Sequence, residues 1–178
     1  MSDQQQTSGA TPERTAEYHE KYMVRVDSVH KHLADKHVLR GLSFDIPRGD
    51  TTVVMGPSGC GKSVLLKHIV GLMRPDSGHV RVDGHDIPSL KHKELSQVRQ
   101  RMGVLFQGAA LFDSMTVEEN VAFMLRQHRR MAQSEIEDAV AEALKLVHLA
   151  DTQALKPAEL SGGMRKRAAI ARALALDP

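Results

Sequence analysis

Apolar and polar residues alternate in two stretches near the start of the chain, 23–29 and 38–46. Alternation with a period of two is typical of strands that have one buried face. The intervening segment KHLADKH is polar and turn-like. We therefore expect these two stretches to form an antiparallel pair, followed by a break at PRGD, residues 47–50.

Two other apolar runs lack this alternation. TTVVM at 51–55 is rich in β-branched residues, which predicts a strand buried on both faces. MGVLF at 102–106 predicts another short strand, ending just before Gln107. Between them, the dipeptide Asp83-Gly84 in HVRVDGHDI predicts a hairpin turn.

Helical patterns make up much of the remaining chain. VLLKHIVGLM at 64–73 is apolar nearly all round, which predicts a helix packed deep in the domain. Thr116 with Glu119 has the spacing of a capping box before a helix, and Ser134 with Glu137 repeats that spacing before another.

The last of these helices has one apolar face, and we interpret it as core packing rather than as a groove for a partner. Its residues are Ile136, Val140, Ala143, Leu144 and Val147.

Composition narrows the class of protein. The 178 residues suffice for one domain or a domain with a small lobe, and 41% hydrophobic with 26% charged residues is ordinary for a globular chain. A net charge of +2 and 3% aromatic residues do not favour a nucleic-acid partner. One cysteine excludes an internal disulfide framework.

No stretch reaches the ~20 apolar residues of a membrane span, and the N-terminus has no signal-peptide core. We expect residues 1–21 to be a flexible polar tail.

The strongest chemical signal is GPSGCGKS at 56–63, which matches G-x-x-x-x-G-K-[ST]. Its glycines allow the backbone to curl so that successive N–H groups point at a phosphate. Lys62 would reach the outer phosphates, Ser63 would offer its hydroxyl to Mg²⁺, and the helix after the loop would present its N-terminus. The predicted phosphate-binding residues are Gly56, Pro57, Ser58, Gly59, Cys60, Gly61, Lys62, Ser63 and Val64. The motif alone would suit a kinase, a GTPase or a motor.

A second anion site is indicated by LSGGMRKR at 160–167. Ser161 can cap a helix whose first residues, Gly162 and Gly163, leave the backbone N–H groups bare. The helical pattern then continues until Asp177-Pro178 ends it.

Together with Gln107, these motifs occur in the order found in the ATP-binding subunits of ABC transporters, which the chain resembles from about residue 23 to 178. The resemblance implies an α/β fold. It comprises a P-loop NTPase core with an N-terminal antiparallel β subdomain and a helical insert. The implied parts are a tail at 1–21, a core at 22–107, a helical subdomain at 108–158, and the signature motif with its helix at 159–178.

The resemblance also implies a mechanism. Two subunits form a homodimer, and Ser161, Gly162 and Gly163 of one contact the γ-phosphate of ATP bound to the other. Gln107 contacts Mg²⁺ and the attacking water, so it is the candidate catalytic residue. The helical subdomain receives an integral membrane permease, which places the protein on the cytoplasmic face of the cell membrane.

Finer features resemble the ATPases of Mla/Mce-type lipid transporters, notably FQGAALFDSMTVEENVAF at 106–123 and Met164 after LSGG. This implies phospholipid or another lipid as cargo and lipid-binding components as partners. One departure is Leu33, which stands where many ABC subunits have an aromatic residue that stacks on adenine, so we expect weak base discrimination.

In the family, a strand ending in Asp and then the catalytic Glu follows this helix, with a later His. The chain contains none of these, and Glu159 precedes the signature. We therefore expect an incomplete ABC ATPase that alone hydrolyses ATP slowly or not at all, since a general base contributes ~10²–10⁴ in rate. The later core strands would also be missing, which would leave 51–55 uncovered.

Two alternatives remain open: a nucleotide-binding module without hydrolysis, and a soluble ABC ATPase of DNA repair or translation.

Other residues invite weaker interpretations. His30, His32 and His37 are close in sequence but have no cysteines or clustered carboxylates beside them, so a metal site is not favoured. His68 is interpreted as a packed or surface histidine. The basic run 165–167 is interpreted as a solvated helix face rather than a nucleic-acid site.

Overall fold

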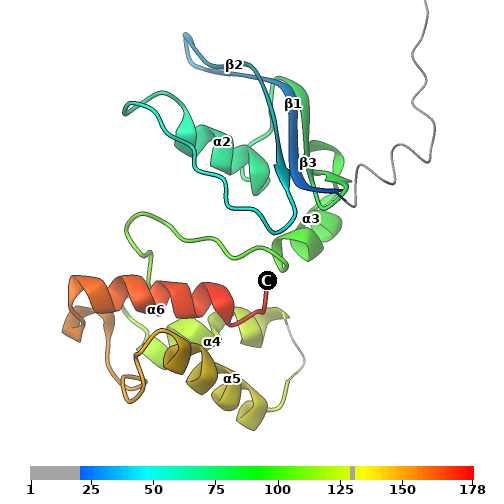
Figure 1. Ribbon diagram of the computed structural model, residues 1–178. Coiled ribbons are helices and arrows are strands. Elements are labelled where there is room, and N and C mark those ends of the chain that lie inside the picture. The colour runs from blue at the N-terminus through cyan, green and yellow to red at the C-terminus, as the bar shows by residue number, and fades with distance from the viewer. Residues whose placement is uncertain (1–20, 129–130) are drawn as a thin grey trace, which may run out of the picture. The chain divides into compact units, whose positions relative to one another are not determined.

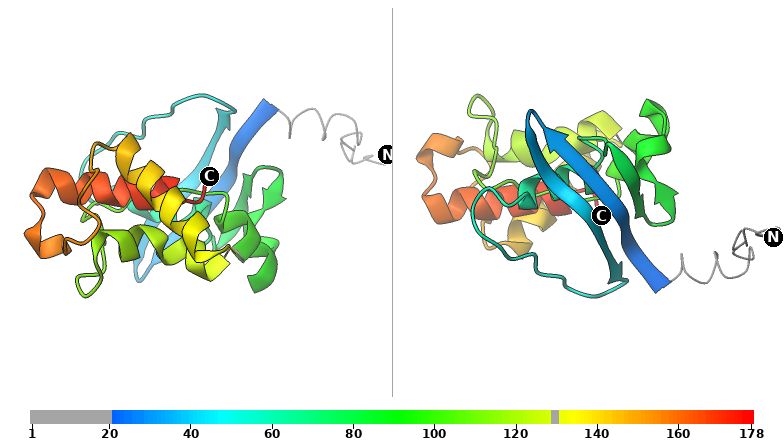
Figure 2. Two further views of the ribbon diagram at one scale, coloured as in Figure 1. Left: turned by 90° about the horizontal axis from the view of Figure 1, so that it is seen from below. Right: turned by 90° about the horizontal axis from the view of Figure 1, so that it is seen from above.

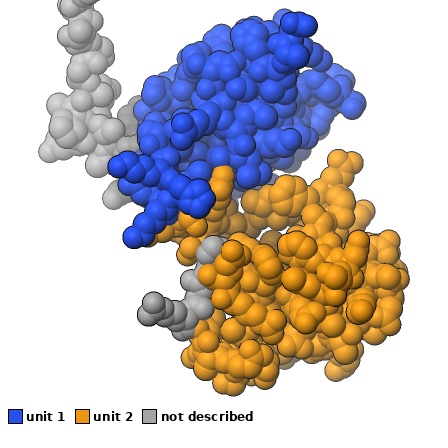
Figure 3. Space-filling view, turned by 180° about the vertical axis from the view of Figure 1, so that it is seen from behind, with its two compact units in different colours: residues 1–95 blue, residues 96–178 orange. Residues whose placement is uncertain are grey.

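The computed structural model describes residues 21–128 and 131–178. The chain divides into two compact units, residues 1–95 and 96–178, which are coloured separately in Figure 3. The expected tail at 1–21 lies outside the described residues except for Lys21. The division into core, helical subdomain and signature segment stays a prediction.

Unit 1 contains a four-stranded antiparallel sheet in the order β2-β1-β3-β4. Figures 1 and 2 show β1 and β2 side by side along most of their length. Buried valines on β1 and β3 form its apolar face. The strands are β1 (Tyr22–Leu33), β2 (Lys36–Pro47), β3 (Ser77–Val82) and β4 (His85–Asp86).

The sequence predicted both hairpins of this sheet. The β1–β2 pair is confirmed, although its strands extend through most of KHLADKH and leave a two-residue turn at Ala34 and Asp35. The second hairpin turns at Asp83 and Gly84, whose φ angles of 49° and 77° suit a tight turn between twisted strands.

The helix after the phosphate-loop motif is shorter and less buried than predicted. It is α2 (Lys62–Ile69), and it buries Leu65 and His68. Leu66 and Leu72 are 57% and 55% exposed, so packing of 64–73 on all sides was a wrong prediction. The 3-10 helix η1 (Ile87–Ser89) and α3 (His92–Arg99) follow the sheet.

Unit 2 is helical, and its three long helices pack around one apolar core (Figures 1 and 2). The elements are α4 (Val117–His128), α5 (Gln133–Leu146), the 3-10 helix η2 (Pro157–Glu159) and α6 (Gly162–Leu174). The predicted apolar face of α5, from Ile136 to Val147, is buried in this core, so its interpretation as core packing is confirmed.

The two predicted capping boxes have different outcomes. At α4, Thr116 N–H donates to the Glu119 carboxylate at 2.8 Å, and Glu119 N–H donates to Thr116 Oγ1 at 3.2 Å, as predicted. At α5 the helix begins earlier, and Ala132 N–H donates to Glu135 Oε2 at 2.6 Å. The Ser134–Glu137 box was therefore a wrong prediction, because Ser134 lies inside the helix.

The segments 51–55 and 102–106 have no regular secondary structure and pair with no strand among the described residues. Val53 is 73% exposed, Met55 86% and Phe106 50%. The prediction of strands at 51–55 and 102–106 was wrong, because a parallel strand forms only where neighbours supply its hydrogen bonds and cover its faces. The exposure of 51–55 confirms the expectation that this segment would be left uncovered.

No helix among the described residues combines the length and apolarity needed to cross a bilayer.

Candidate phosphate-binding site

The loop at 56–63 leads directly into α2, and two of its glycines have left-handed backbone angles. Gly59 has φ +76° and Gly61 has φ +106°. A Cβ on Gly61 would lie 3.0 Å from Val38 Cγ1 and 3.2 Å from Leu39 Cδ2. Glycine at 61 therefore satisfies both a backbone angle and a close approach to β2.

The side chain of Lys62 folds back over this loop. Its ammonium donates to the carbonyl oxygens of Gly56 and Pro57, each at 2.8 Å, and lies 3.7 Å from Cys60 Sγ. Cys60 is exposed. The loop thus carries one ammonium group and one exposed free thiol close to each other.

The first turn of α2 has no side-chain cap, since its N-cap is Gly61. The leading N–H groups of a helix have no partner within the helix, and they carry the positive end of its dipole. Residues 56–60 and Ser63 are exposed. The loop, the uncapped helix start and Lys62 together fit an anion such as a phosphate, and the Ser63 hydroxyl is available to a hydrated cation beside it.

The tip of the β1–β2 hairpin lies against this loop. Lys36 Nζ is 3.5 Å from the carbonyl oxygen of Gly59. In the same hairpin, the rings of His32 and His37 stack with centroids 4.0 Å apart, and those of His30 and His37 lie 5.3 Å apart. The Lys31 ammonium, together with His32, holds the pKa of the Asp76 carboxyl well below its usual range.

The histidines of this stack form no metal cluster. No group of three or more His, Cys, Asp or Glu that could hold a metal was found in the part of the chain that the structure describes. Partial desolvation, followed by the neighbouring charges of His32, His30 and Arg40, lowers the pKa of His37.

Gln107 lies in an exposed turn of unit 2. Two and three residues after Gln107, Ala109 and Ala110 both have left-handed φ angles, 64° and 51°. Arg172 of α6 donates to their carbonyl oxygens at 3.1 Å and 2.7 Å. Arg172 thus ties this segment to α6, a contact for which the sequence offered no signal.

The start of α6 agrees with the predicted helix cap. Ser161 is the N-cap, and its hydroxyl accepts a hydrogen bond from Met164 N–H at 3.2 Å. Gly162 and Gly163 are exposed in the first turn. The helix start is accessible, as an anion-binding role would require, but that role stays a prediction.

The predicted site residues thus fall in two groups. The loop residues, Gly56–Val64, lie together in unit 1. Gln107 and the Ser161–Gly163 segment belong to unit 2. The sequence did not predict that the ammonium group of Lys36 lies beside this loop, although its charge and its position in a turn-like segment were visible.

The antiparallel sheet, the glycine-rich loop entering α2 and the helical unit define a P-loop protein of the α/β class. The model of the ABC transporter family matches residues 39–178, and the chain belongs to that family.

Curated relatives agree with this assignment. The chain is 47% identical over 155 residues to the "Probable ribonucleotide transport ATP-binding protein mkl" of Mycobacterium leprae (strain TN), covering 87% of this chain and 45% of that protein. It is 46% identical over 144 residues to the "Intermembrane phospholipid transport system ATP-binding protein MlaF" of Haemophilus influenzae, covering 81% and 54%. The chain therefore spans about half the length of these relatives.

Solved structures show the same fold. An "ATP-binding cassette MJ0796 bound to ADP and Pi", in a dimeric post-hydrolysis state, matches with a TM-score of 0.80 and 35% identity, covering 88% of this chain and 71% of that one. The structure of cbiO1 from Clostridium perfringens matches with a TM-score of 0.79 and 30% identity, covering 89% and 63%.

Proposed function

We propose that the chain is part of an ATP-binding subunit of an ABC transporter, which binds Mg-ATP and in the whole protein hydrolyses it to drive transport. The observation that carries the proposal is the loop at 56–63. It has glycines at left-handed angles, an uncapped helix start, and the Lys62 ammonium bound to its backbone carbonyls. Residues Gly56 to Val64 hold the phosphates, and Ser63 ligates Mg²⁺.

The second half of the proposed site comes from another copy of the subunit. Ser161, Gly162 and Gly163 contact the γ-phosphate of ATP bound across a homodimer, where the capped helix start supplies N–H groups. Gln107 reaches Mg²⁺ and the attacking water. The dimeric cassette bound to ADP and Pi, at 35% identity, supports this arrangement.

The helical subdomain, 108–158, contacts the membrane permease. A groove of about 430 Å³ on α4 offers a partly apolar docking surface in this region, and its lining combines Phe123 and Met115 with polar residues. The remaining lining residues are Glu119, Arg126 and Gln127. Through the permease, the protein works on the cytoplasmic face of the membrane.

We propose a phospholipid or another lipid as cargo, with Mla/Mce-type lipid-binding proteins as further partners. The name of the Haemophilus influenzae relative supports a phospholipid, whereas the Mycobacterium leprae relative is named for ribonucleotide transport. Co-purification of the whole protein with its membrane partners, followed by mass spectrometry of bound small molecules, separates these cargoes. Recovery of nucleotides without lipid would overturn the lipid proposal.

Nucleotide binding is tested by titrating the chain with a fluorescent ATP analogue in the presence and absence of Mg²⁺. We expect saturable binding that ATP displaces, and a loss of about tenfold or more in affinity in Lys62→Ala, because a charge-assisted contact to phosphate is removed. Lys67→Ala removes an exposed lysine from the far end of α2 and should bind as the wild type does. Absence of saturable binding would contradict the proposal.

Hydrolysis needs a separate measurement, made on the whole protein with its permease. Steady phosphate release that stops in Gln107→Ala or Lys62→Ala supports the ATPase. Tight binding without turnover would favour the non-hydrolysing nucleotide-binding module instead.

A further inference from the structure

We propose that Lys36, at the tip of the β1–β2 hairpin, is a second cation of the phosphate site and contacts the phosphate chain of the bound nucleotide. This rests on the nucleotide binding proposed above. It adds a residue that lies outside the loop motif and 20 positions or more before it in the sequence.

The hairpin tip and the loop meet at two contacts. The space that a Cβ on Gly61 would need is occupied by Val38 and Leu39, at 3.0 Å and 3.2 Å. Two residues before Val38, the Nζ atom of Lys36 lies 3.5 Å from the carbonyl oxygen of Gly59. Figure 1 shows the tip and the loop at the same end of unit 1. The start of β2 is thus packed against the loop that would hold the phosphates.

The backbone that carries Lys36 is paired within the β1–β2 hairpin, while its side chain is exposed. Lys36 pairs with Leu33 across the turn, and the next pair is His32 with His37, whose rings stack at 4.0 Å. On β1, the Asp76 carboxylate accepts hydrogen bonds from the His32 N–H at 2.6 Å and from Lys31 Nζ at 2.7 Å, which restrains this strand. A cation on a fixed hairpin loses less conformational freedom on binding than one on a mobile loop.

The backbone oxygens that the two ammonium groups now contact are neutral. Lys62 donates to loop carbonyls, and Lys36 approaches another carbonyl of the same loop at the outer limit of a hydrogen bond. A phosphate oxygen is an anion and makes shorter, stronger bonds to an ammonium than a neutral carbonyl does. Both ammonium groups would therefore gain by turning from the loop to a bound phosphate.

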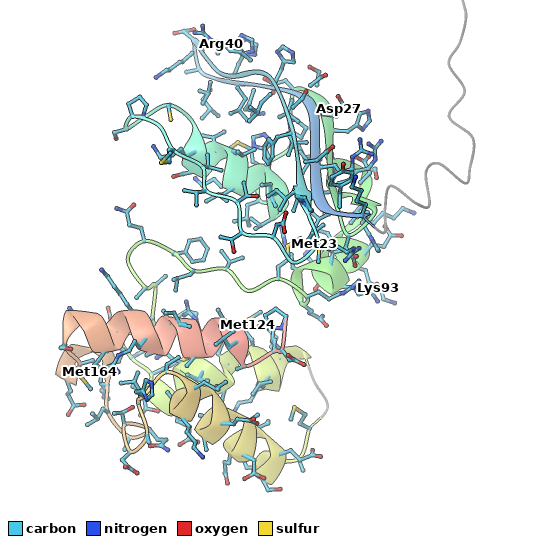
Figure 4. All side chains as sticks on the ribbon, viewed as in Figure 1. Met23, Asp27, Arg40, Lys93, Met124 and Met164 are labelled. Atoms are coloured by element: carbon cyan, nitrogen blue, oxygen red, sulfur yellow. The ribbon has the colours of Figure 1, made fainter. Side chains whose placement is uncertain are left out.

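The test is competition between a fluorescent trinitrophenyl-ATP and unlabelled ATP, ADP or adenosine, using the full 178-residue chain. The variants are Lys36→Gln, which removes the charge, and Lys36→Arg, which keeps it. The matched control is Lys93→Gln, because Lys93 is exposed on α3 at the end of unit 1 remote from the hairpin tip, where Arg40 is labelled (Figure 4). Circular dichroism and a thermal scan verify that each variant is folded.

We expect Lys36→Gln to weaken ATP and ADP binding about fivefold or more, with adenosine unaffected, and Lys36→Arg to retain most of the affinity. The effect should shrink at high ionic strength. Equal affinities for Lys36→Gln and Lys93→Gln would overturn the proposal. An equal loss for adenosine would also overturn it, since Lys36 would then contact the base or ribose. If the wild type binds no nucleotide, the proposed function itself fails.

Discussion

Gly61 combines a left-handed backbone angle with a neighbour that leaves no room for a methyl group. An alanine there must keep φ near +106° and push against Val38 and Leu39. We expect Gly61→Ala to lower the free energy of unfolding by about 2 kcal/mol or more, adding backbone strain to overpacking. Urea unfolding measures the change.

The control for this substitution is Gly49→Ala. Gly49 has φ +78° but no atom within 4 Å of the added Cβ, so only the cost of a left-handed backbone, about 1–2 kcal/mol, applies. Equal losses in the two variants would show that the contact with β2 contributes nothing.

Cys60 reports on occupancy of the loop, because it is the one cysteine in the chain and it is exposed. A phosphate in the loop would cover the thiol and engage Lys62, which lies 3.7 Å from it. We expect saturating Mg-ATP to slow maleimide labelling in proportion to the fraction of chain left unbound. Cys60→Ser is the control for non-specific labelling. A labelling rate unchanged by nucleotide would contradict binding at this loop.

The histidine stack predicts a pH dependence of stability. The pKa of His37 is lowered from 6.5, so the unfolded chain takes up this proton before the folded chain does. Above pH 6.5 the group has no effect, and stability falls as the pH drops from 6.5 towards the lowered folded value. The groups that act on the ring are the neighbouring charges of His32, His30 and Arg40, and the Asp76 carboxylate binds His32 rather than His37.

The measurement is the thermal midpoint between pH 7.5 and 5.5 in the wild type and in His37→Phe, which keeps a stacking ring but cannot be protonated. We expect the variant to lose less stability over this range. The lowered pKa of Asp76 acts elsewhere, because its contribution is lost only below its ordinary value of 3.8. Parallel curves for the two chains would rule out the stack as the cause.

At the level of elements, α6 is joined to the segment after Gln107 by one side chain. Ala109 and Ala110 hold left-handed angles that cost an alanine about 1–2 kcal/mol each, and Arg172 binds both carbonyls. Without the guanidinium the strained turn should relax. We expect Arg172→Gln to speed amide hydrogen exchange at 108–111 while the core of α6 stays protected.

Lys166→Gln is the matched control, since Lys166 is an exposed residue of the same helix. Unchanged exchange at 108–111 in Arg172→Gln would show that the turn is held by other contacts. A general increase across α6 would point instead to loss of the helix.

The elements that the sequence predicted well are those with local causes. Asp83-Gly84 forms a turn because its own backbone angles suit one, and Thr116 with Glu119 satisfies N–H groups three residues away. The apolar face of α5 is read from its own periodicity. Such features need no knowledge of distant partners.

The failures depend on partners far along the chain. TTVVM has the composition of a buried strand, but composition cannot supply the neighbours that would pair with it, and it lies exposed here. Arg172 donates to the Ala110 carbonyl, 62 positions earlier in the chain. The buried Asn120 side chain binds both the N–H and the carbonyl of Phe112. No sequence pattern predicted either contact. For the site, the motif located the loop, whereas the approach of Lys36 depends on how β2 packs.

Over the whole molecule, the described chain has two compact units but leaves apolar segments without regular structure exposed. The chain spans about half the length of curated relatives such as mkl and MlaF. The apolar side chains of 51–55 are exposed, as are Leu105 and Phe106 of 102–106, and neither segment pairs with a strand among the described residues. Each flanks a candidate site residue, since the loop follows the first and Gln107 follows the second. Covering these segments would therefore also restrain the site.

Unpaired, apolar extended segments are templates for association with other chains. We expect the 178-residue chain without nucleotide to self-associate as its concentration rises, and Val53→Lys combined with Met55→Lys to reduce this, because charges oppose edge pairing. Leu72→Lys is the control, since Leu72 is 55% exposed but lies outside these segments. Sedimentation velocity over a concentration series decides the question. Equal association of the double variant and the control would show that another surface mediates self-association. A wild type that stays monomeric would show that these segments do not associate with other chains in solution.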